Sequence, residues 1–196
     1  MAWRRPKVTG RVATTVTFLE TTDPPKGPPL QPPEGVEVVR VLEPAVSFWR
    51  FLYETAGEPW LWTERRLEDD DAIRTMIRAE GRDLRVLWLH GQPAGFAELD
   101  LADPDAVELL YFGILPDFVG RGLGRYFLDW TVRHAFAKGA RRLWLHTCDL
   151  DAPQALANYE ARGLAPYDRE ADEVPVIEGM GLPAHVGNRP IRPPHD

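Results

Sequence analysis

The chain has 196 residues, a formal net charge of −7 and an isoelectric point near 5.3. An acidic balance of this size does not favour the broad basic surface that nucleic acid needs. No stretch approaches the roughly 18 uncharged apolar residues of a membrane span, and no apolar segment follows the basic start "MAWRRPK" as it would in a secretory signal. The single cysteine, Cys148, cannot form an internal disulfide, which suits the reducing cytoplasm. We therefore expect a cytoplasmic protein, and the charge and hydropathy predict no nucleic-acid or membrane partner.

The first part of the chain predicts a strand followed by a stiff connector. β-Branched residues alternate along residues 8–20, which is typical of a strand. Residues 23–35 carry repeated Pro-Pro pairs and no helical or strand period, as in an extended polyproline-like segment. We therefore expect residues 1–35 to form an arm that joins the main body or a partner subunit. An exposed edge on this strand would favour a homodimer.

The following residues alternate between strand and helix patterns. A strand pattern at 36–42 precedes a helical pattern that stops near Gly57. An aromatic loop comes next, and then a short helix that is led by acidic residues and closed by Gly81. Strand patterns at 84–90 and 93–101, joined by a tight turn, predict an antiparallel hairpin.

The second half of the body continues this alternation. Residues 106–115 are apolar at nearly every position, which is typical of a strand covered on both faces. A broad apolar stripe predicts a helix over 123–139, and a strand pattern follows at 142–148. Asp151 then stands where it would cap a helix that ends near Gly163.

Strands and helices that alternate in this way predict a layered α/β body over residues 36–170. The hairpin makes part of the sheet antiparallel, whereas a strand, turn, helix and strand in succession predict a parallel crossover. The sheet is therefore expected to be mixed. Residues 171–196 have scattered prolines and glycines and little period, so we expect a strap or a flexible end there.

The stretch "VGRGLGR", residues 119–125, places three glycines at alternate positions between the strand at 106–115 and the next helix. It is not a dinucleotide-binding fingerprint, because Arg125 stands where the third glycine belongs. It is not a Walker A loop, because Arg125 and Tyr126 follow its last glycine. Two interpretations are left: a plain loop, or a cradle in which backbone N–H groups at a helix N-terminus bind a pyrophosphate. Arg121 and Arg125 would add positive charge at the rim.

Two segments around this stretch resemble the GNAT acetyltransferase superfamily. "ELLYFGILPDFVGRGLGRYFLDWTVRHA" resembles the strand, the acetyl-CoA loop (Gln/Arg-x-x-Gly-x-Gly/Ala) and the helix of that family, and "NYEARGL" at 158–164 resembles its later "LYEKxGF" segment. The resemblance covers residues 36–170. It implies an α/β fold with a mixed, mostly antiparallel central sheet and helices on both faces, acetyl-CoA as cosubstrate, and N-acetyltransferase activity. The strand at 8–20 is then an addition to that fold.

The resemblance also implies which residues hold acetyl-CoA. Val119 stands where the family has Gln or Arg, so only its backbone contact carries over, and Ala152 stands where many members have a cofactor-contacting asparagine. A main-chain N–H near Ile114 or Leu115, where the family's strands splay apart, is expected to meet the carbonyl oxygen. The cofactor-binding residues expected on these grounds are Ile114, Leu115, Val119, Gly120, Arg121, Gly122, Leu123, Gly124, Arg125, Ala155 and Tyr159.

Three residues are candidates for proton transfer during acyl transfer. Glu108 occupies the strand position where several family members keep a general base, and alternation places it on one face with Phe112 and Ile114, where desolvation would raise its pKa. Glu98 in "GFAELD" is a second candidate base on the neighbouring strand. Tyr159 matches the family tyrosine that protonates the leaving thiolate, a role suited to a phenol with a pKa near 10. Each also has an ordinary alternative, as a solvated strand-end carboxylate or a packed core ring.

Cys148 and His146 would share a strand face, which raises the alternative of a thiol–imidazole nucleophile. A buried free cysteine is the commoner case. The histidines show no metal-ligand spacing, so no metal is expected.

The acceptor site implied by the family lies near the first helices, where Trp49, Trp60 and Trp62 precede a run of acidic residues. Aromatic rings beside acids suit a cationic or aromatic amine, and a small-molecule amine is favoured over a protein acceptor. The alternative from a different functional class is a non-catalytic acyl-CoA-binding sensor or assembly module.

Overall fold

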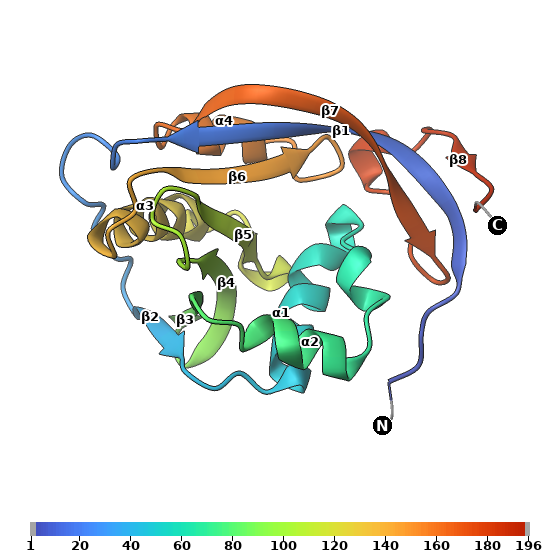
Figure 1. Ribbon diagram of the computed structural model, residues 1–196, viewed down its shortest axis with the longest axis horizontal. Helices are drawn as coiled ribbons and strands as arrows, with labels where there is room; N and C mark the ends of the chain where they lie inside the picture. The colour runs from blue at the N-terminus through green and yellow to red at the C-terminus, as the bar shows by residue number, and fades with distance from the viewer. Residues whose placement is uncertain (1–2, 195–196) are drawn as a thin grey trace.

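The computed structural model describes residues 3–194 and confirms a mixed α/β architecture. In that part of the chain, one eight-stranded sheet has the order β2-β3-β4-β5-β6-β1-β7, and β8 pairs with β1. The neighbouring strands are antiparallel except for β5 and β6. Helices cover both faces of the sheet, as the family resemblance implies (Figure 1).

The strands are β1 (Val8–Thr21), β2 (Val36–Val41), β3 (Arg82–Leu89), β4 (Gln92–Asp100), β5 (Val107–Ile114), β6 (Leu143–Cys148), β7 (Ala165–Ile177) and β8 (Ile191–Arg192). The α-helices are α1 (Val46–Gly57), α2 (Asp70–Ile77), α3 (Leu123–Ala137) and α4 (Ala155–Glu160). Short 3-10 helices are η1 (Glu58–Trp60), η2 (Glu64–Arg66), η3 (Pro116–Phe118) and η4 (Ala184–Val186).

Each face of the sheet has its own hydrophobic core. On one face, α3 packs the fully buried Phe127 and Val132 against the strands. On the other face, α1 and α2 pack Trp49 and Ile73 against Phe96 of β4, and all three side chains are fully buried. Among the described residues, no helix combines the length and the apolarity that a membrane crossing requires.

The N-terminal strand β1 lies inside the sheet, with β6 on one side and β7 on the other. Figure 1 shows β1 and β7 as two long curved strands that follow each other along the sheet. The predicted arm therefore joins the main body of its own chain. The exposed edge that favoured a homodimer is a wrong expectation for this strand, because both edges of β1 pair with strands of the same chain.

The proline-rich connector between β1 and β2 lies against α3. The Leu30 N–H donates to Asp129 Oδ2 over 3.3 Å, and Arg133 Nη2 donates to the Gly27 carbonyl over 3.1 Å. Asp129 is almost fully buried and also accepts a hydrogen bond from Arg162, which follows α4. These contacts fix the course of the connector.

The segment after α4 is more regular than its sequence indicates. β7 runs through residue 170, where the sequence pattern placed the end of the main body, and it pairs with β1 along most of its length. Residues 165–172 are exposed on both faces of the strand. Such a strand has no alternation of polar and apolar residues, so the pattern from which a strand is predicted is absent.

A β-bulge in β5 decides which of its side chains face which core. Glu98 of β4 lies opposite Tyr111, but the next residue, Leu99, lies opposite Leu109. Leu110 is therefore an extra residue in β5. After an extra residue, side chains that simple alternation places on one face lie on the other.

The bulge separates Glu108 from the residues that were expected to share its face. Glu108 lies opposite Asp100, on the α1 side of the sheet, and Tyr111 packs on the same side. Phe112 and Ile114 pack against the α3 core. The predicted common face of Glu108, Phe112 and Ile114 is therefore wrong, because the bulged residue is invisible in the sequence pattern.

Candidate active site

The parallel strands β5 and β6 separate soon after they meet. Their register holds only Val107 opposite Leu143 and Glu108 opposite Trp144. Beyond these pairs β5 continues to Ile114, next to the glycine stretch. Backbone groups along the separated part of β5 need partners other than β6.

The backbone of β5 directs an amide into this gap. The Leu115 N–H, just after β5, donates to the Ala94 carbonyl of β4 over 2.9 Å. Because successive N–H groups of a strand point to opposite sides, the Ile114 N–H points toward the side that β6 has left. Of the two amides expected near the carbonyl oxygen, that of Leu115 is already used by the sheet, and that of Ile114 fits the role.

A cavity of about 300 Å³, here called the glycine-loop cavity, lies beside β5, the start of α3 and α4. Gly120 and Gly122 have φ angles of +83° and +76°, which residues with a Cβ rarely adopt. Gly122 is the N-cap of α3, and its carbonyl accepts a bond from the Tyr126 N–H over 3.4 Å. The first N–H groups of α3 have no acceptor inside the helix, which suits an anion such as a pyrophosphate. The predicted cofactor-binding residues that line this cavity are Ile114, Val119, Gly120, Gly122, Gly124, Arg125, Ala155 and Tyr159.

Three other residues predicted to bind the cofactor have side chains directed elsewhere. Leu115 and Leu123 are buried, and Leu123 belongs to the core beneath α3. The Arg121 guanidinium lies over the Phe118 ring, 5.2 Å from its centroid. Arg125 lines the glycine-loop cavity and is the arginine placed there for a phosphate group.

A smaller cavity of about 130 Å³, here called the inner cavity, adjoins the glycine-loop cavity. Strands β1, β5, β6 and β7 contribute to its walls, and the loop after α1 covers it. Two of the three tryptophans predicted at the acceptor site line both cavities. The residues that line both, and so mark the junction, are Trp60, Trp62, Phe112, Asp151 and Tyr159.

Tyr159 lies at this junction, where a donor to a leaving thiolate is needed. Burial raises the pKa of its phenol above the ordinary 10.0, and the Asp151 carboxylate raises it further. The pKa near 10 expected from sequence is therefore too low. A phenol with a raised pKa stays protonated at neutral pH and can donate a hydrogen bond.

Glu98 and Trp49 bond to each other away from both cavities. Trp49 is fully buried, Glu98 is 1% exposed, and the Trp49 indole Nε1 donates to Glu98 Oε2 over 2.6 Å. Burial raises the pKa of Glu98, although this hydrogen bond acts in the opposite direction. Neither side chain lines either cavity. The geometry therefore does not support a base at Glu98 or an acceptor contact at Trp49, because both side chains are enclosed between α1 and β4.

Glu108 is connected to the inner cavity through His146 of β6. The Glu108 Oε1 and His146 Nδ1 atoms lie 3.8 Å apart, and His146 lines the cavity. Burial raises the pKa of Glu108, and the nearby His146 acts in the opposite direction. The sequence indicates His146 only as a partner for Cys148. Glu108 and His146 lie far apart in the sequence, so no local sequence pattern links them.

Cys148 also lines the inner cavity but is not activated there. Burial raises the pKa of its thiol to about 11, and the Asp151 carboxylate contributes to the rise. A thiol with a raised pKa is a poor nucleophile at neutral pH, because the thiolate is the reactive form. The alternative of a Cys148–His146 nucleophile is not supported.

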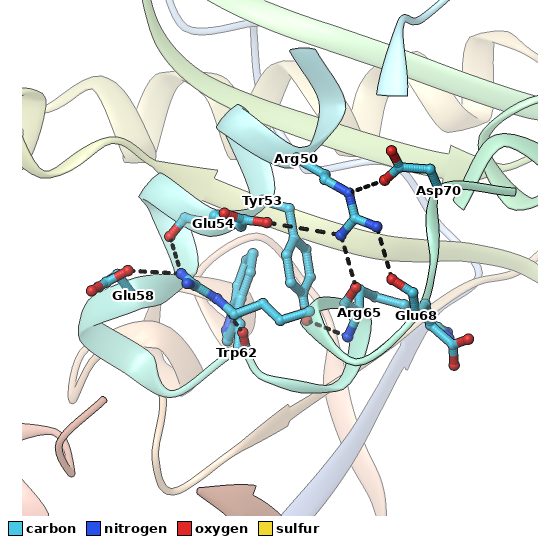
Figure 2. Close-up of polar contacts among 9 residues, drawn as sticks. Arg50, Tyr53, Glu54, Glu58, Trp62, Arg65, Glu68 and Asp70 are labelled. Carbon is cyan, nitrogen blue, oxygen red and sulfur yellow. Dashed lines mark hydrogen bonds and ion pairs between the residues drawn. The ribbon is translucent and has the colours of Figure 1, made fainter. Parts of the chain in front are cut away.

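Two arginines hold the cover loop, residues 58–69, on α1 (Figure 2). The Arg50 Nη2 donates to the Glu68 carbonyl over 2.8 Å. Arg66 lies within the loop, and its Nε donates to the Trp62 carbonyl over 3.2 Å. Its Nη2 reaches a carbonyl of α1 over 2.7 Å. These bonds fix the loop backbone above the inner cavity.

The inner cavity shares the exposed residues Glu64 and Asp172 with an outer cavity of about 570 Å³. The outer cavity thus extends the inner one toward solvent. Acidic side chains outnumber basic ones around it, which attracts cations. Its charged lining residues are Glu64, Glu68, Asp69, Asp172 and Glu173 together with Arg5 and Arg11.

Fold and site together define the class of protein. Two parallel strands separate beside a helix with a glycine-rich N-terminus, and a phenol lies where the two cavities meet. This is the arrangement of an acyltransferase. The chain belongs to the GNAT acetyltransferase family, because the model described as "Acetyltransferase (GNAT) family" matches residues 47–164, more than half of its length.

The comparisons with individual proteins agree with this family. The chain is 34% identical over 116 residues to a mycothiol acetyltransferase from Acidothermus cellulolyticus, a match that covers 57% of this chain but only 35% of the relative. A solved GCN5-related N-acetyltransferase from Sphaerobacter thermophilus has a TM-score of 0.64 at 16% identity, over 91% of this chain and 56% of that one. Another from Kribbella flavida has a TM-score of 0.57 at 20% identity, over 87% and 61%. The structural matches support the fold.

Proposed function

We propose that the protein transfers an acetyl group from acetyl-CoA directly to a primary amine of a small molecule. The observation that carries this proposal is the junction at Tyr159, which joins a cavity suited to the CoA pyrophosphate with a second cavity that has an acidic entrance. The curated relative is named an acetyltransferase, which supports acetyl as the group transferred.

Arg125 and the N-terminus of α3 are the groups that would hold the pyrophosphate of acetyl-CoA. The Ile114 N–H, directed into the gap between β5 and β6, would donate to the acetyl carbonyl or to the pantetheine arm. These contacts use backbone groups and the Arg125 side chain, so they do not depend on the missing family side chains at Val119 and Ala152.

In the proposed reaction, the amine nitrogen bonds to the carbonyl carbon, the carbon–sulfur bond breaks, and the sulfur takes a proton. An ammonium must first lose a proton, because it has no lone pair to attack with. We assign that proton to His146, which lines the inner cavity. Glu108, 3.8 Å away, would stabilise the imidazolium that forms. Tyr159 would donate its hydroxyl proton to the sulfur, and the second proton, which the nitrogen loses once it is bonded to the carbonyl carbon, would return to the Tyr159 oxygen.

The entrance of the inner cavity supports a cationic acceptor. Glu64 and Asp172 lie where the inner and outer cavities meet, so an ammonium group would be attracted along this route. The rings of Trp60 and Trp62 at the junction offer cation–π contacts. The small volume of the inner cavity favours a small amine over a folded protein segment.

Release of free thiol from acetyl-CoA in the presence of tyramine, histamine, ethanolamine or spermidine tests the proposal. We expect release above the rate of hydrolysis for at least one amine. Tyr159→Phe should lower kcat at least about tenfold at an unchanged Kd for CoA, because only the proton donor is lost. The matched control is Tyr167→Phe, which alters an exposed tyrosine outside both cavities and should keep the wild-type rate.

Two other results would decide against catalysis. CoA binding by calorimetry, with no thiol release for any amine, would favour a non-catalytic acyl-CoA-binding module. Failure to bind CoA at all would overturn both functions, because each depends on the glycine-loop cavity.

A further inference from the structure

We propose that Asp151 is a positioning residue that holds the Trp62 indole at the junction of the two cavities. Trp62 Nε1 donates to Asp151 Oδ1 over 3.0 Å. This hydrogen bond joins the cover loop to the turn between β6 and α4, two segments far apart in sequence. The inference rests on the proposed function, because it concerns how the same junction is kept in shape.

Asp151 is itself fixed by its own turn. Its Oδ2 atom accepts the Thr147 hydroxyl over 2.7 Å and the Cys148 N–H over 3.1 Å. The sequence pattern placed Asp151 as the cap of the next helix, but α4 begins at Ala155 with Gln154 at the cap position. The carboxylate therefore has one oxygen for the turn and one for the indole.

The chain around Trp62 is shaped to admit this ring. A Cβ on Gly57 would lie 2.4 Å from the Trp62 Cβ, too close for any side chain there. The Trp62 N–H donates to the Gly57 carbonyl over 3.1 Å, and Arg66 bonds to the Trp62 carbonyl. Two hydrogen bonds thus fix the Trp62 backbone, and the bond to Asp151 fixes its indole ring.

The position of the Trp62 ring matters to both cavities. Its centroid lies 5.5 Å from that of Tyr53 and 5.9 Å from that of Tyr111, and both tyrosines line the inner cavity. Trp62 also lines the glycine-loop cavity. A shift of the ring would therefore change the shape of the passage between acyl donor and acceptor.

Asp151 acts on a second residue of the junction. After burial, its carboxylate is the next cause of the raised pKa of Tyr159. One side chain thus places the indole and helps to keep the phenol protonated. This dual position distinguishes Asp151 from Asp149 in the same turn, which bonds to Thr14 and Arg189.

Exchange of the indole proton tests the hydrogen bond without any need for turnover. In protein labelled with nitrogen-15 tryptophan, the Trp62 signal is the one that Trp62→Phe lacks. In Asp151→Asn only one side-chain oxygen remains, and it cannot accept both the Trp62 indole and the two donors of the turn, Thr147 and Cys148. We therefore expect the Trp62 indole proton to exchange at least about tenfold faster. Asp149→Asn is the matched control and should leave that exchange rate unchanged.

A double-mutant cycle with the panel amine of highest kcat/KM tests the role in catalysis. Trp62→Phe and Asp151→Asn should each lower kcat/KM for the amine about tenfold, and the double variant should fall by much less than the product of the two effects, because both remove the same bond. Trp60→Phe is the comparison, since Trp60 lines both cavities but its ring lies 6.1 Å from that of His185. Its effect should multiply with that of Asp151→Asn.

Trp62→Phe leaves the turn bonds of Asp151 intact, so it remains informative if Asp151→Asn does not fold. Equal exchange rates in Asp151→Asn and Asp149→Asn, multiplying effects of Trp62→Phe and Asp151→Asn, or an unchanged kcat/KM in Trp62→Phe would each overturn the inference. If no amine reacts, but exchange at Trp62 accelerates in Asp151→Asn and CoA shifts the Trp62 signal, the proposed function fails and the positioning of Trp62 stands.

Discussion

The glycine-loop cavity and the inner cavity are built from different parts of the chain. Apart from Trp60 and Trp62, the residues around the glycine-loop cavity lie between residues 112 and 159, and it offers a helix N-terminus. The inner cavity gathers side chains from residue 14 to residue 174. The first site is local in sequence, and the second is assembled by the fold. The inner cavity depends on elements from most of the chain, whereas the glycine-loop cavity depends mainly on the continuous segment from β5 to α4.

The largest expected effect comes from a substitution in β1, the N-terminal strand, which contributes Thr14 and Val16 to the inner cavity. Val12 is fully buried, so Val12→Asp places an unpaired carboxylate in the core. We expect the free energy of unfolding, measured with urea, to fall by about 3–5 kcal/mol. Thr15→Asp, at an exposed position of the same strand, should change it by less than about 0.5 kcal/mol. Equal effects would mean that β1 is not a core strand.

The next substitution is expected to disrupt the glycine-loop cavity and to leave the inner cavity intact. Gly122→Val puts a β-branched residue at a φ of +76° and a side chain at the N-terminus of α3. We expect the Kd for CoA, measured by calorimetry, to rise about 100-fold. Gly179→Val imposes the same strain at a φ of +86°, with no atom near its Cβ and outside both cavities, so CoA binding should not change. A Kd that rises equally in both variants would assign the effect to strain alone.

What could be predicted from sequence follows the same division. Local sequence patterns predict three features of the donor side: the glycine stretch, the helix after it and the place of Tyr159. The sheet type followed from the order of strands and helices. Backbone conformation at Gly122, for example, is encoded by one residue type at one position.

The acceptor side could not be predicted in the same way. The bulge at Leu110 changes the face of Glu108 without any mark in the sequence, and it separates Glu108 from Phe112. Trp49 and Trp62 have the same residue type in neighbouring segments, yet one is enclosed with Glu98 and the other lies between two cavities. Only tertiary packing decides between such residues.

A smaller effect is expected from a substitution that loosens the cover loop above the inner cavity. Arg66→Ala removes the bond to the Trp62 carbonyl and the bond to α1, so the cover loop should lose order. We expect the KM for the reactive amine to rise about fivefold while the Kd for CoA stays within about twofold. Arg74→Ala, on α2 and outside both cavities, is the matched control. An increase in the Kd for CoA equal to that in the KM would mean that the loop serves both cavities alike.

Two buried carboxylates on opposite faces of the sheet differ in the direction in which the fold moves their pKa values. Burial raises the pKa of Glu98, and among the described residues the Trp49 indole is its one hydrogen-bond donor, at 2.6 Å. Burial also acts to raise the pKa of Asp83, but hydrogen bonds from His134 and Arg85 outweigh it and lower the value to about 2. The partners on each face therefore decide the direction.

Opposite pH dependences of the free energy of unfolding follow from these opposite shifts. With a raised folded pKa, the contribution of Glu98 to stability is full below its unfolded value of 4.5 and is lost as the pH rises through the folded value. Glu98→Gln keeps an acceptor for Trp49 and should remove this slope, which is about 1.4 kcal/mol per pH unit between the unfolded and the folded pKa. The contribution of Asp83 is present above 3.8 and is lost as the pH falls through about 2, so Asp83→Asn should remove an acid-side slope instead. Urea unfolding across about pH 2 to 8 measures both slopes. A Glu98→Gln curve parallel to that of the wild type would mean that Glu98 ionises in the core as readily as in water.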